Sequence, residues 1–412
     1  MKILCILYDD PKNGMPKSYA LDNLPKIDKY PDGMTLPSPN GRDFNEGELL
    51  GCVSGELGLR KFLESNGHQL IVTSDKDGDG CTADKELVDS DIVISQPFFP
   101  YYLTREKMES APNLKMAITA GIGSDHVDLQ AAMDRKVDVV EVTYCNSRSV
   151  AEHIVMMIVS MVRDYHTQYA IVNNGGWNIA DAVQRSYDVE GMHIGTVAAG
   201  RIGLDALRKM KPFDVHLHYF DRHRLPDAIE KELNLTFHES VESMVKVCDV
   251  VTINCPLHPE TEHLFDKTMI NKMKKGAYIV NTARGKICDK DAIAAALKSG
   301  QLSGYAGDVW FPQPAPNDHP WRTMPHHGMT PHTSGTSLSA QTRYADGVRE
   351  ILECFFDKKE IRNQYLIVQN GELAGMGAHS YSKGTATDGS EEAAKYQKNI
   401  CSSNGMFLKN ST

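Results

Sequence analysis

The sequence predicts an α/β protein with two domains, each built on a parallel sheet. Short apolar segments alternate with polar or helical segments along most of the chain, a rhythm typical of parallel strands connected by helices. One apolar segment, 193–197, runs into the turn Ala198-Ala-Gly200-Arg-Ile-Gly203, whose spacing resembles the glycine pattern of dinucleotide-binding folds. We therefore expect two Rossmann-like, doubly wound domains, one of which binds a nucleotide.

Composition and charge exclude several classes of protein. The chain has 412 residues, 41% of them hydrophobic and 24% charged, so it is long enough for two or three domains with proper cores. It contains no apolar run long enough to cross a bilayer, which predicts that it does not enter a membrane. Its formal net charge of −10 argues against a nucleic-acid partner.

The cysteines and the first residues indicate a cytoplasmic protein. The nine cysteines are scattered and form no Cys-x-x-Cys pair, which argues against a disulfide framework or a zinc site. The apolar segment 3–8 is short and is followed at once by Asp9 and Asp10, so it predicts a strand rather than a signal peptide. Cys255 leaves two interpretations open, an oxidation-sensitive thiol beside a cofactor or an inert buried cysteine.

The first third of the chain contains the strands of one sheet. Strands are predicted at 3–8, 69–73, 92–95, 115–119 and 139–142. The Pro/Gly/Asp-rich segment 11–48 is too long for a plain turn and predicts a surface arm or an interface element. Residues 75–86 match the spacing of a calcium-binding loop, but a strand rather than a helix precedes them, which favours a solvated acidic turn.

The second half follows the same rhythm around the nucleotide-binding turn. Strands are predicted at 193–197, 215–220, 250–255, 277–281 and 304–309. Helices are predicted at 153–163, 204–210, 289–299 and 339–356, the first starting from a capping-box pattern at Ser149 and Glu152 and the third ending at Gly300. The Gly/Ser/Ala-rich segment 371–391 predicts either an ordered coil that returns to the first domain or a disordered tail.

The turn after residue 197 has the features that a pyrophosphate needs. Gly200 lets the backbone approach the phosphates, and Gly203 lets the following helix pack close to its strand. Asp221 ends the next predicted strand eighteen residues after Gly203, where a partner of the ribose hydroxyl belongs. A carboxylate there favours NAD over NADP, because it repels a 2′-phosphate. Ala198 stands at the first glycine position, so a turn that serves packing alone stays an alternative.

Two further strand ends offer side chains for hydride-transfer chemistry. Arg284, in 281–286, suits a carboxylate because its planar guanidinium can donate to two oxygens. His332, in 330–335, can donate a hydrogen bond to a substrate or carry a proton. Taken singly, such residues are more often a surface charge or a core imidazole, but their shared position at strand ends of one sheet favours a site.

These segments and others resemble the D-2-hydroxyacid dehydrogenase superfamily, and within it the metal-free, NAD-dependent formate dehydrogenases. The resemblance extends to about residue 397 and is carried by Ser95-Gln-Pro97-Phe98-Phe, Thr119-Ala-Gly-Ile122-Gly, Thr143-Tyr-Cys-Asn146-Ser147, Asn254-Cys-Pro256-Leu-His258, Asn281-Thr-Ala-Arg284-Gly, Gly307-Asp308-Val-Trp-Phe-Pro-Gln313-Pro and Pro331-His332-Thr-Ser334-Gly335. It implies a substrate domain made of residues 1–146 and 336–412, with an NAD domain, 147–335, inserted between them. It also implies a homodimer, with the helix after Ser149 near the interface.

The resemblance implies a pocket for formate and a groove for NAD, and no metal. The implied catalytic set is Arg284, His332, Asn146 and Gln313, and the implied formate contacts are Ile122, Asn146, Pro97, Phe98 and Arg284. The implied NAD contacts are Ser147, Ala198, Gly200, Arg201, Ile202, Gly203, Asp221, Pro256, Leu257, His258, Pro259, Glu260, Thr282, Asp308, His332, Thr333, Ser334, Gly335 and Ser380.

Gln313 is the residue that favours formate as the substrate. Formate yields carbon dioxide and a hydride without releasing a proton, so its oxidation requires no general base. The hydroxyacid relatives carry Glu at this position, whose charge supports proton transfer by the histidine, whereas a neutral amide can only orient it. Two alternatives stay open: a D-2-hydroxyacid dehydrogenase, and a non-catalytic NAD-sensing binding protein of the same fold.

Overall fold

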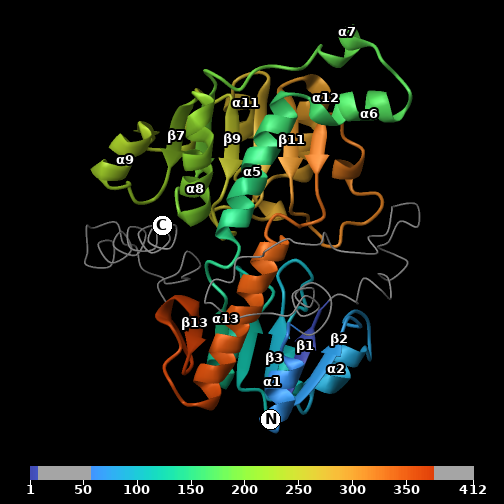
Figure 1. The fold of residues 1–412 in the computed structure, drawn as a ribbon, viewed down its shortest axis with the longest axis vertical. Coiled ribbons are helices and arrows are strands. Elements are labelled where there is room, and N and C mark those ends of the chain that lie inside the picture. Colours follow the sequence, from blue (N-terminus) through green and yellow to red (C-terminus); the bar gives the residue numbers. More distant parts are fainter. Residues whose placement is uncertain (8–56, 375–412) are drawn as a thin grey trace. The chain divides into compact units, whose positions relative to one another are not determined.

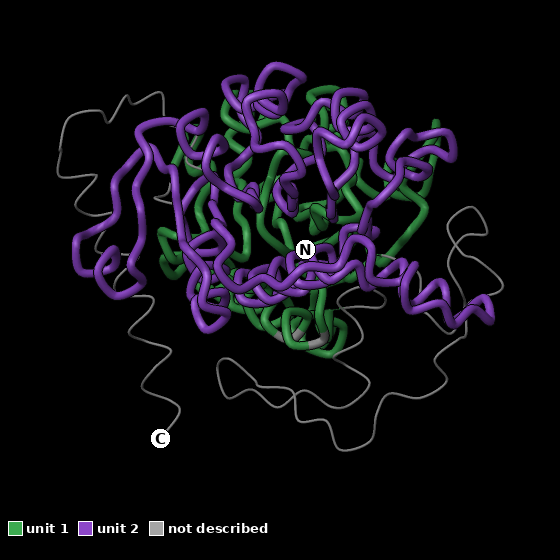
Figure 2. Tube along the Cα trace, turned by 90° about the horizontal axis from the view of Figure 1, so that it is seen from above, with its two compact units in different colours: residues 1–146, 335–383 green, residues 147–334, 384–412 purple. Residues whose placement is uncertain are grey.

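The structure is a computed structural model in which residues 1–7 and 57–374 are described. The chain divides into two compact units, which Figure 2 shows in different colours. Among the described residues, unit 1 contains 1–7, 57–146 and 335–374, and unit 2 contains 147–334. Unit 2 therefore differs from the expected NAD domain by Gly335, which belongs to unit 1. The segment 11–48, Ser380 and the end of the chain lie outside the described residues.

Unit 1 is a seven-stranded sheet with helices packed against it (Figure 1). Its strands are β1 (Lys2–Ile6), β2 (Gln69–Thr73), β3 (Ile92–Ser95), β4 (Met116–Thr119), β5 (Asp138–Glu141), β13 (Leu366–Gln369) and β14 (Glu372–Leu373). The order β14-β13-β5-β4-β3-β1-β2 contains a parallel part in the 2-1-3-4-5 order of flavodoxin-like sheets. β13 and β14 add an antiparallel edge that the prediction of a parallel sheet omits. Its helices are α1 (Arg60–Ser65), α2 (Thr82–Leu87), α3 (Arg105–Ser110), α4 (Leu129–Arg135) and α13 (Leu338–Phe356).

Unit 2 is a second seven-stranded sheet, and all its strand pairs are parallel. Its strands are β6 (His193–Val197), β7 (His216–Phe220), β8 (Leu235–Phe237), β9 (Val250–Ile253), β10 (Ala277–Asn281), β11 (Leu302–Gly307) and β12 (His327–Met329). The order β12-β11-β10-β9-β6-β7-β8 is the doubly wound dinucleotide-binding order, extended by one strand. Its helices are α5 (Ser147–Val162), α6 (Tyr165–Asn173), α7 (Ile179–Ala182), α8 (Arg201–Met210), α9 (Asp227–Leu233), α10 (Val241–Val245), α11 (Lys267–Lys272) and α12 (Lys290–Ser299).

The α/β fold with two doubly wound sheets is confirmed, and each predicted strand matches an observed strand to within two residues at either end. Apolar strand residues are buried because helices cover the sheets, as in β9, where every residue is buried. Gly300, at φ 73°, ends α12, as the sequence predicts. The capping box at Ser149 is wrong, because α5 already starts at Ser147 and Ser149 is buried in its first turn. Among the described residues, no helix is both long and apolar enough to span a membrane.

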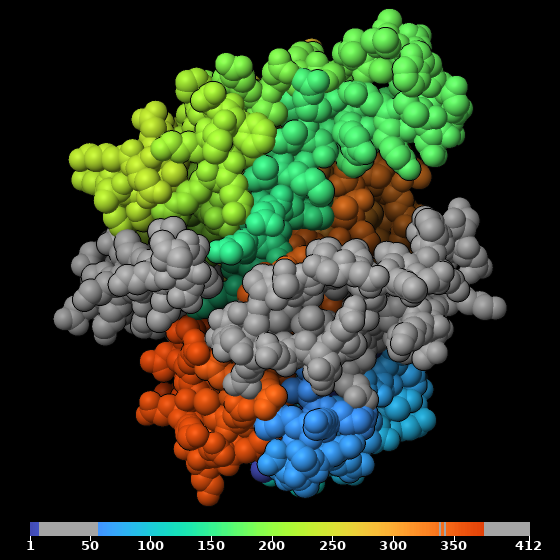
Figure 3. All heavy atoms as spheres, in the orientation of Figure 1, coloured from blue at the N-terminus to red at the C-terminus, as the bar shows by residue number. Residues whose placement is uncertain are grey.

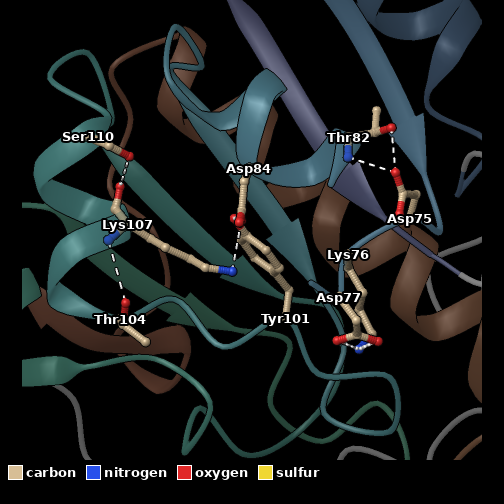
Figure 4. A network of polar contacts seen from close by, with 9 residues as sticks. All are labelled: Asp75, Lys76, Asp77, Thr82, Asp84, Tyr101, Thr104, Lys107 and Ser110. Carbon is tan, nitrogen blue, oxygen red and sulfur yellow. Dashed lines mark hydrogen bonds and ion pairs between the residues drawn. The ribbon is translucent and has the colours of Figure 1, made fainter. Parts of the chain in front are cut away.

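Of residues 75–86, which match a calcium-loop pattern, 75–81 precede α2 and 82–86 lie in it. Asp75 Oδ2 accepts hydrogen bonds from the backbone nitrogen of Thr82 at 2.8 Å and from its Oγ1 at 2.7 Å, and so caps the start of α2 (Figure 4). Asp77 accepts from Nζ of Lys76 at 2.8 Å. In the part of the chain that the structure describes, no group of three or more His, Cys, Asp and Glu side chains is arranged to hold a metal ion. These contacts favour the acidic turn.

Three histidines in unit 2 form a hydrogen-bonded chain. His193 Nδ1 lies 2.8 Å from His218 Nε2, and His218 Nδ1 lies 3.0 Å from His238 Nε2. Burial, and then the neighbouring imidazoles of His238, His193 and His216, lower the pKa of His218 to about 4, while Asp249 opposes this shift. Each nitrogen–nitrogen contact holds one proton, so the chain is satisfied when its members are neutral.

We predict that this chain makes the protein labile in acid. The pKa of His218 falls from 6.5 to about 4 on folding, so the unfolded state binds more protons between these values. The free energy of unfolding should therefore fall by about 3 kcal/mol as the pH drops from 6.5 to 4. His218→Gln, which cannot titrate, should flatten the pH dependence of the urea midpoint in this window. His263→Gln, which changes an exposed histidine outside this chain, is the control; equal curves for wild type and His218→Gln would contradict the prediction.

Candidate active site

The parallel strands of unit 2 end in register. Val197 pairs with Phe220 on one side and with Ile253 on the other, and Ile253 pairs with Asn281. Asn281 pairs in turn with Gly307, and Gly307 with Met329. The segments that follow these residues therefore leave the sheet along one edge, on both sides of the reversal in strand order between β6 and β9. Nearly all the predicted NAD contacts lie in these segments.

The turn between β6 and α8 is tightly packed. Gly200 has extended backbone and is the N-cap of α8, so the first amides of the helix point out of its end. A Cβ at Gly203 would lie 2.2 Å from the carbonyl oxygen of Ala198 and 2.7 Å from Thr196 Oγ1, so only glycine fits. Ala198 adopts φ 72°, the left-handed conformation that favours glycine at this position of the pattern. The backbone of this turn thus has the close packing and the conformation that the glycine spacing predicts.

Asp221 follows β7 and holds the same turn. Its Oδ2 accepts from the backbone nitrogen of Ala199 at 2.8 Å, and its Oδ1 accepts from the backbone nitrogen of His223 at 3.0 Å. Each carboxylate oxygen has a further lone pair, so Asp221 can still accept from a ribose hydroxyl. The carboxylate is fixed before any ligand arrives.

The segments after β9 and β10 continue this edge of the sheet. Pro256, Leu257 and His258 are half-buried and Pro259 and Glu260 exposed, in a turn where Thr261 Oγ1 accepts from the backbone nitrogen of His258 at 2.8 Å. Thr282 is buried, and its Oγ1 has no hydrogen-bond partner within the described part of the chain. A buried hydroxyl without a partner is costly, so a ligand that supplies one is favoured here.

Arg284 lies in a turn that buried groups shape. Asn281, fully buried, donates from Nδ2 to the carbonyl oxygen of Arg284 at 3.0 Å and accepts at Oδ1 from the backbone nitrogen of Ala283 at 3.0 Å. A Cβ at Gly285 would lie 2.5 Å from the carbonyl carbon of Trp310, so the turn packs closely on the next segment. The guanidinium of Arg284 is half-buried and donates to the carbonyl oxygen of Ala283 at 2.7 Å. Its fork is partly desolvated, which strengthens its attraction for an anion.

His332 and Gln313 meet side chain to side chain. His332 Nδ1 lies 2.8 Å from Gln313 Nε2 and 3.0 Å from Oε1, and both side chains are half-buried. Because the amide of Gln313 can present either atom, it orients the ring without adding a charge. The contact with Gln313 therefore fixes the orientation of the His332 ring.

Asp308, fully buried, holds the segment that carries His332. Its Oδ1 accepts from Thr330 Oγ1 at 2.5 Å and from the backbone nitrogen of Thr333 at 2.7 Å, and its Oδ2 accepts from that of Ser334 at 2.8 Å. His332 itself adopts φ 60°, an unfavourable conformation for a residue with a side chain, so its neighbours must hold it there. The hydrogen bonds that Asp308 accepts from Thr330, Thr333 and Ser334 hold this segment in place.

In unit 1, the strands carrying the predicted formate contacts also end in register, with Ser95 beside Thr119 and Thr119 beside Glu141. Pro97 packs against Gly121, where a Cβ would lie 2.8 Å from Pro97 Cδ, and Ile122 follows directly. The ring of Phe98 lies 6.0 Å from that of Tyr344 on α13.

Asn146 is buried and ends unit 1. Its Oδ1 has no hydrogen-bond partner among the residues that are described, while a Cβ at Gly335 would lie 2.5 Å from its Nδ2. Ser147 begins α5 in the next unit, and Arg201 and Ile202 begin α8. Ser380 lies outside the described residues.

Sequence reasoning missed several residues that hold the site. Glu141 is buried and accepts from the backbone nitrogen of Gly123 at 2.9 Å and from Ser124 Oγ at 3.3 Å, next to Ile122. An acid at a predicted strand end was the available signal. Tyr344, whose hydroxyl donates to the carbonyl oxygen of Gly335, has no such signal in the sequence.

The surroundings of Cys255 favour the second of its two interpretations, an inert buried cysteine. It is buried, and burial raises the pKa of its thiol to about 12. Since the thiolate is the reactive form, this favours a packing role over an oxidation-sensitive one.

Comparisons with known proteins agree with this geometry. The NAD binding domain of the D-isomer specific 2-hydroxyacid dehydrogenases matches residues 155–334. A formate dehydrogenase of Pseudomonas sp. (strain 101) is 68% identical over 399 residues, covering 97% of this chain and all of the relative. The chain belongs to the formate dehydrogenase family. The family prediction, and with it an NAD-dependent oxidoreductase, is confirmed.

Two solved structures of the family share the fold over nearly their whole length. One is a Granulicella formate dehydrogenase, with a TM-score of 0.82 and 63% identity over 91% of this chain and 100% of that one. The other is an NAD-dependent formate dehydrogenase from Staphylococcus aureus in complex with NAD, with a TM-score of 0.74 and 40% identity over 89% of this chain and 99% of that one. The matched NAD-binding domain contains the edge of the unit 2 sheet described above.

Proposed function

We propose that this protein oxidises formate with NAD⁺, giving carbon dioxide and NADH. Family membership supports an NAD-dependent oxidation, and the His332–Gln313 pair is the observation that favours formate as the substrate. A hydroxy acid must lose a hydroxyl proton when its hydride leaves, whereas formate loses none. A histidine oriented by a neutral amide suits the second case. This favours formate over both a hydroxy acid and a non-catalytic role.

We infer that NAD binds at the strand ends of unit 2. We assign the pyrophosphate to the backbone between Gly200 and Gly203, the ribose to Asp221, and a further hydrogen bond to the unsatisfied hydroxyl of Thr282. The other predicted contacts, from 256–260 and 330–335, line the same edge. When bound, the nicotinamide ring accepts the hydride.

Formate is held by charge and shape. We assign its oxygens to the N–H donors of the Arg284 guanidinium and of Asn146 Nδ2, and the apolar wall that excludes water to Pro97, Phe98 and Ile122. The formate C–H bond breaks, its electron pair leaves as the hydride, and the carboxylate loses its charge as carbon dioxide forms. The protein thus contributes mainly orientation and electrostatics.

We also propose that the protein is a cytoplasmic homodimer that pairs through the segment 165–187. This segment contains α6 and α7 (Figure 1), is green in Figure 3 and exposes large apolar side chains. Trp177 is 81% exposed, Ile179 69% and Tyr169 58%. A hollow of about 490 Å³ between α6 and α7 is lined in part by Ile171 and Trp177. Clusters of exposed aromatic and other large apolar side chains are typical of subunit interfaces.

The free cysteines among the described residues suit a reducing compartment.

The proposed reaction predicts NADH formation with formate alone. Absorbance assays with formate, D-lactate and D-glycerate, each in EDTA, should give a signal only with formate. Turnover of a hydroxy acid without formate would replace the proposal by the dehydrogenase alternative. NAD binding without any turnover would favour the sensing protein.

Gln313→Glu should make formate turnover depend on pH near neutrality. A carboxylate 2.8–3.0 Å from His332 Nδ1 would stabilise the imidazolium and so raise the pKa of His332. The profile of kcat/KM between pH 6 and 9 should gain an ionisation that wild type lacks. Gln130→Glu, on the exposed face of α4, adds the same charge and should leave the profile unchanged. Identical profiles for wild type and Gln313→Glu would contradict the assigned role of the pair.

Trp177→Asp should dissociate the dimer. A buried charge in place of an interface aromatic typically weakens association by about 100-fold or more. Light scattering should show twice the chain mass of 45.7 kDa for wild type and a larger monomer fraction for the variant. Val88→Asp replaces another exposed apolar residue, outside the segment 165–187, and is the control. A monomeric wild type would refute the dimer.

A further inference from the structure

The loop that carries Pro97 and Phe98 lacks regular structure. It runs from Gln96 to Thr104, between β3 and α3, and its only strand-like contacts in the described residues are isolated bridges from Gln96 to Phe99 and from Leu103 to Val127. Most of its side chains are nevertheless buried. Side-chain contacts must therefore fix the position of the wall that we assign to formate.

Tyr101 provides one group of these contacts. Its hydroxyl donates to Asp84 Oδ1 on α2 at 2.6 Å, and Nζ of Lys107 on α3 lies 2.8 Å from the same carboxylate oxygen. Nζ of Lys107 also lies 4.0 Å from the centre of the Tyr101 ring. Figure 4 shows the three side chains converging from the loop and two helices. We call Tyr101, Asp84 and Lys107 the tyrosine clamp.

Because Tyr101 is buried, its hydroxyl depends on Asp84 as a hydrogen-bond acceptor. Tyr101 is 2% exposed, and burial, then the hydrogen bond to Asp84, raises the pKa of its phenol, so the hydroxyl stays a donor. Burial opposes ionisation of Asp84, but the hydrogen bonds from Lys107 and Tyr101 hold its pKa below the usual range. A buried hydroxyl deprived of this acceptor would be left unsatisfied, which disfavours any other placement of Tyr101.

Further contacts along the loop link the position of Tyr101 to the positions of Pro97 and Phe98, which form the wall. Nζ of Lys76 lies 4.5 Å from the centre of the Phe99 ring, and the Phe98 ring lies 6.0 Å from that of Tyr344. Pro97 packs on Gly121. Only two residues separate Phe98 from Tyr101, so a shift of the phenol moves the wall rather than being absorbed along the loop.

We propose that the tyrosine clamp is a positioning device for the formate pocket: it fixes the 96–104 loop so that Pro97 and Phe98 close on a substrate as small as formate. This inference rests on the proposed function. The clamp touches neither the reacting atoms nor NAD; it acts through the loop. Its loss should therefore weaken the use of formate while NAD binding stays intact.

Tyr101→Phe tests the clamp by removing one hydroxyl. At saturating NAD⁺, the KM for formate should rise about tenfold and kcat should fall less, because a misplaced wall weakens formate binding and its alignment. The Kd for NAD⁺, measured by calorimetry without formate, should not change. The matched control is Tyr365→Phe, which removes a buried hydroxyl that donates to Glu350 at 3.5 Å, with Arg362 5.8 Å from the ring. This second Tyr–acid–base group lies in unit 1 but not on the loop.

The outcomes are separable. A raised formate KM in Tyr101→Phe but not in Tyr365→Phe, at a similar loss of Tm, supports the clamp; equal formate kinetics in the two variants overturn it. Should Tyr101→Phe fail to fold, Lys107→Met decides, since it removes the charge and keeps the stem: a raised KM supports the clamp and an unchanged KM overturns it. Failure of the proposed function is distinct, because wild type itself would then not oxidise formate.

Discussion

The common register of the strand ends is the constraint on which the rest of the molecule depends. In unit 2, Val197, Ile253, Asn281 and Gly307 pair across four adjacent strands, so the segments after them emerge side by side. The order of strands reverses between β6 and β9, and this leaves room for a ligand at that edge. Residues scattered over more than a hundred positions of the sequence are thereby gathered along one edge of the sheet. Unit 1 repeats the principle on a smaller scale with Ser95, Thr119 and Glu141.

Register brings the segments together, but buried carboxylates give them their shape. Asp308 accepts from Thr330, Thr333 and Ser334, and so keeps His332 in a backbone conformation it would otherwise avoid. Asp221 and Glu141 do the same for the turn at Ala199 and the loop at Gly123. Asp308 and Asp221 accept mainly from backbone amides, whose positions do not depend on side-chain rotamers, and Glu141 accepts from one backbone amide and two hydroxyls. Such sites are rigid before a ligand binds, which lowers the entropy cost of binding.

What the sequence could predict follows from the range of the interaction. Gly203 and Asp221 act within one strand–turn–helix unit, so their spacing predicts their contacts. The start of α5 was misjudged because a capping box at Ser149 is a local signal that the helix overrides by beginning at Ser147. The short strands β8, β12 and β14 have too few residues to show a period, and β13 forms an antiparallel edge beside β5, which is distant in the sequence. Tyr344 and the clamp of Tyr101 with Asp84 were beyond prediction for the same reason, since tertiary packing alone joins them.

The positions of the buried carboxylates indicate that the neutral amide of Gln313 has a role of its own beside His332. The protein uses carboxylates freely as buried acceptors, at Asp308 and Glu141, where backbone and hydroxyl donors surround them. Beside His332 it has Gln313 instead, at the same hydrogen-bond distance that a carboxylate would take. A negative side chain there would repel an anionic substrate and, by stabilising the imidazolium, would add a proton that formate oxidation does not use. In the proposed reaction Arg284 is the charge that attracts formate, and that attraction weakens as carbon dioxide forms, which favours release of the product.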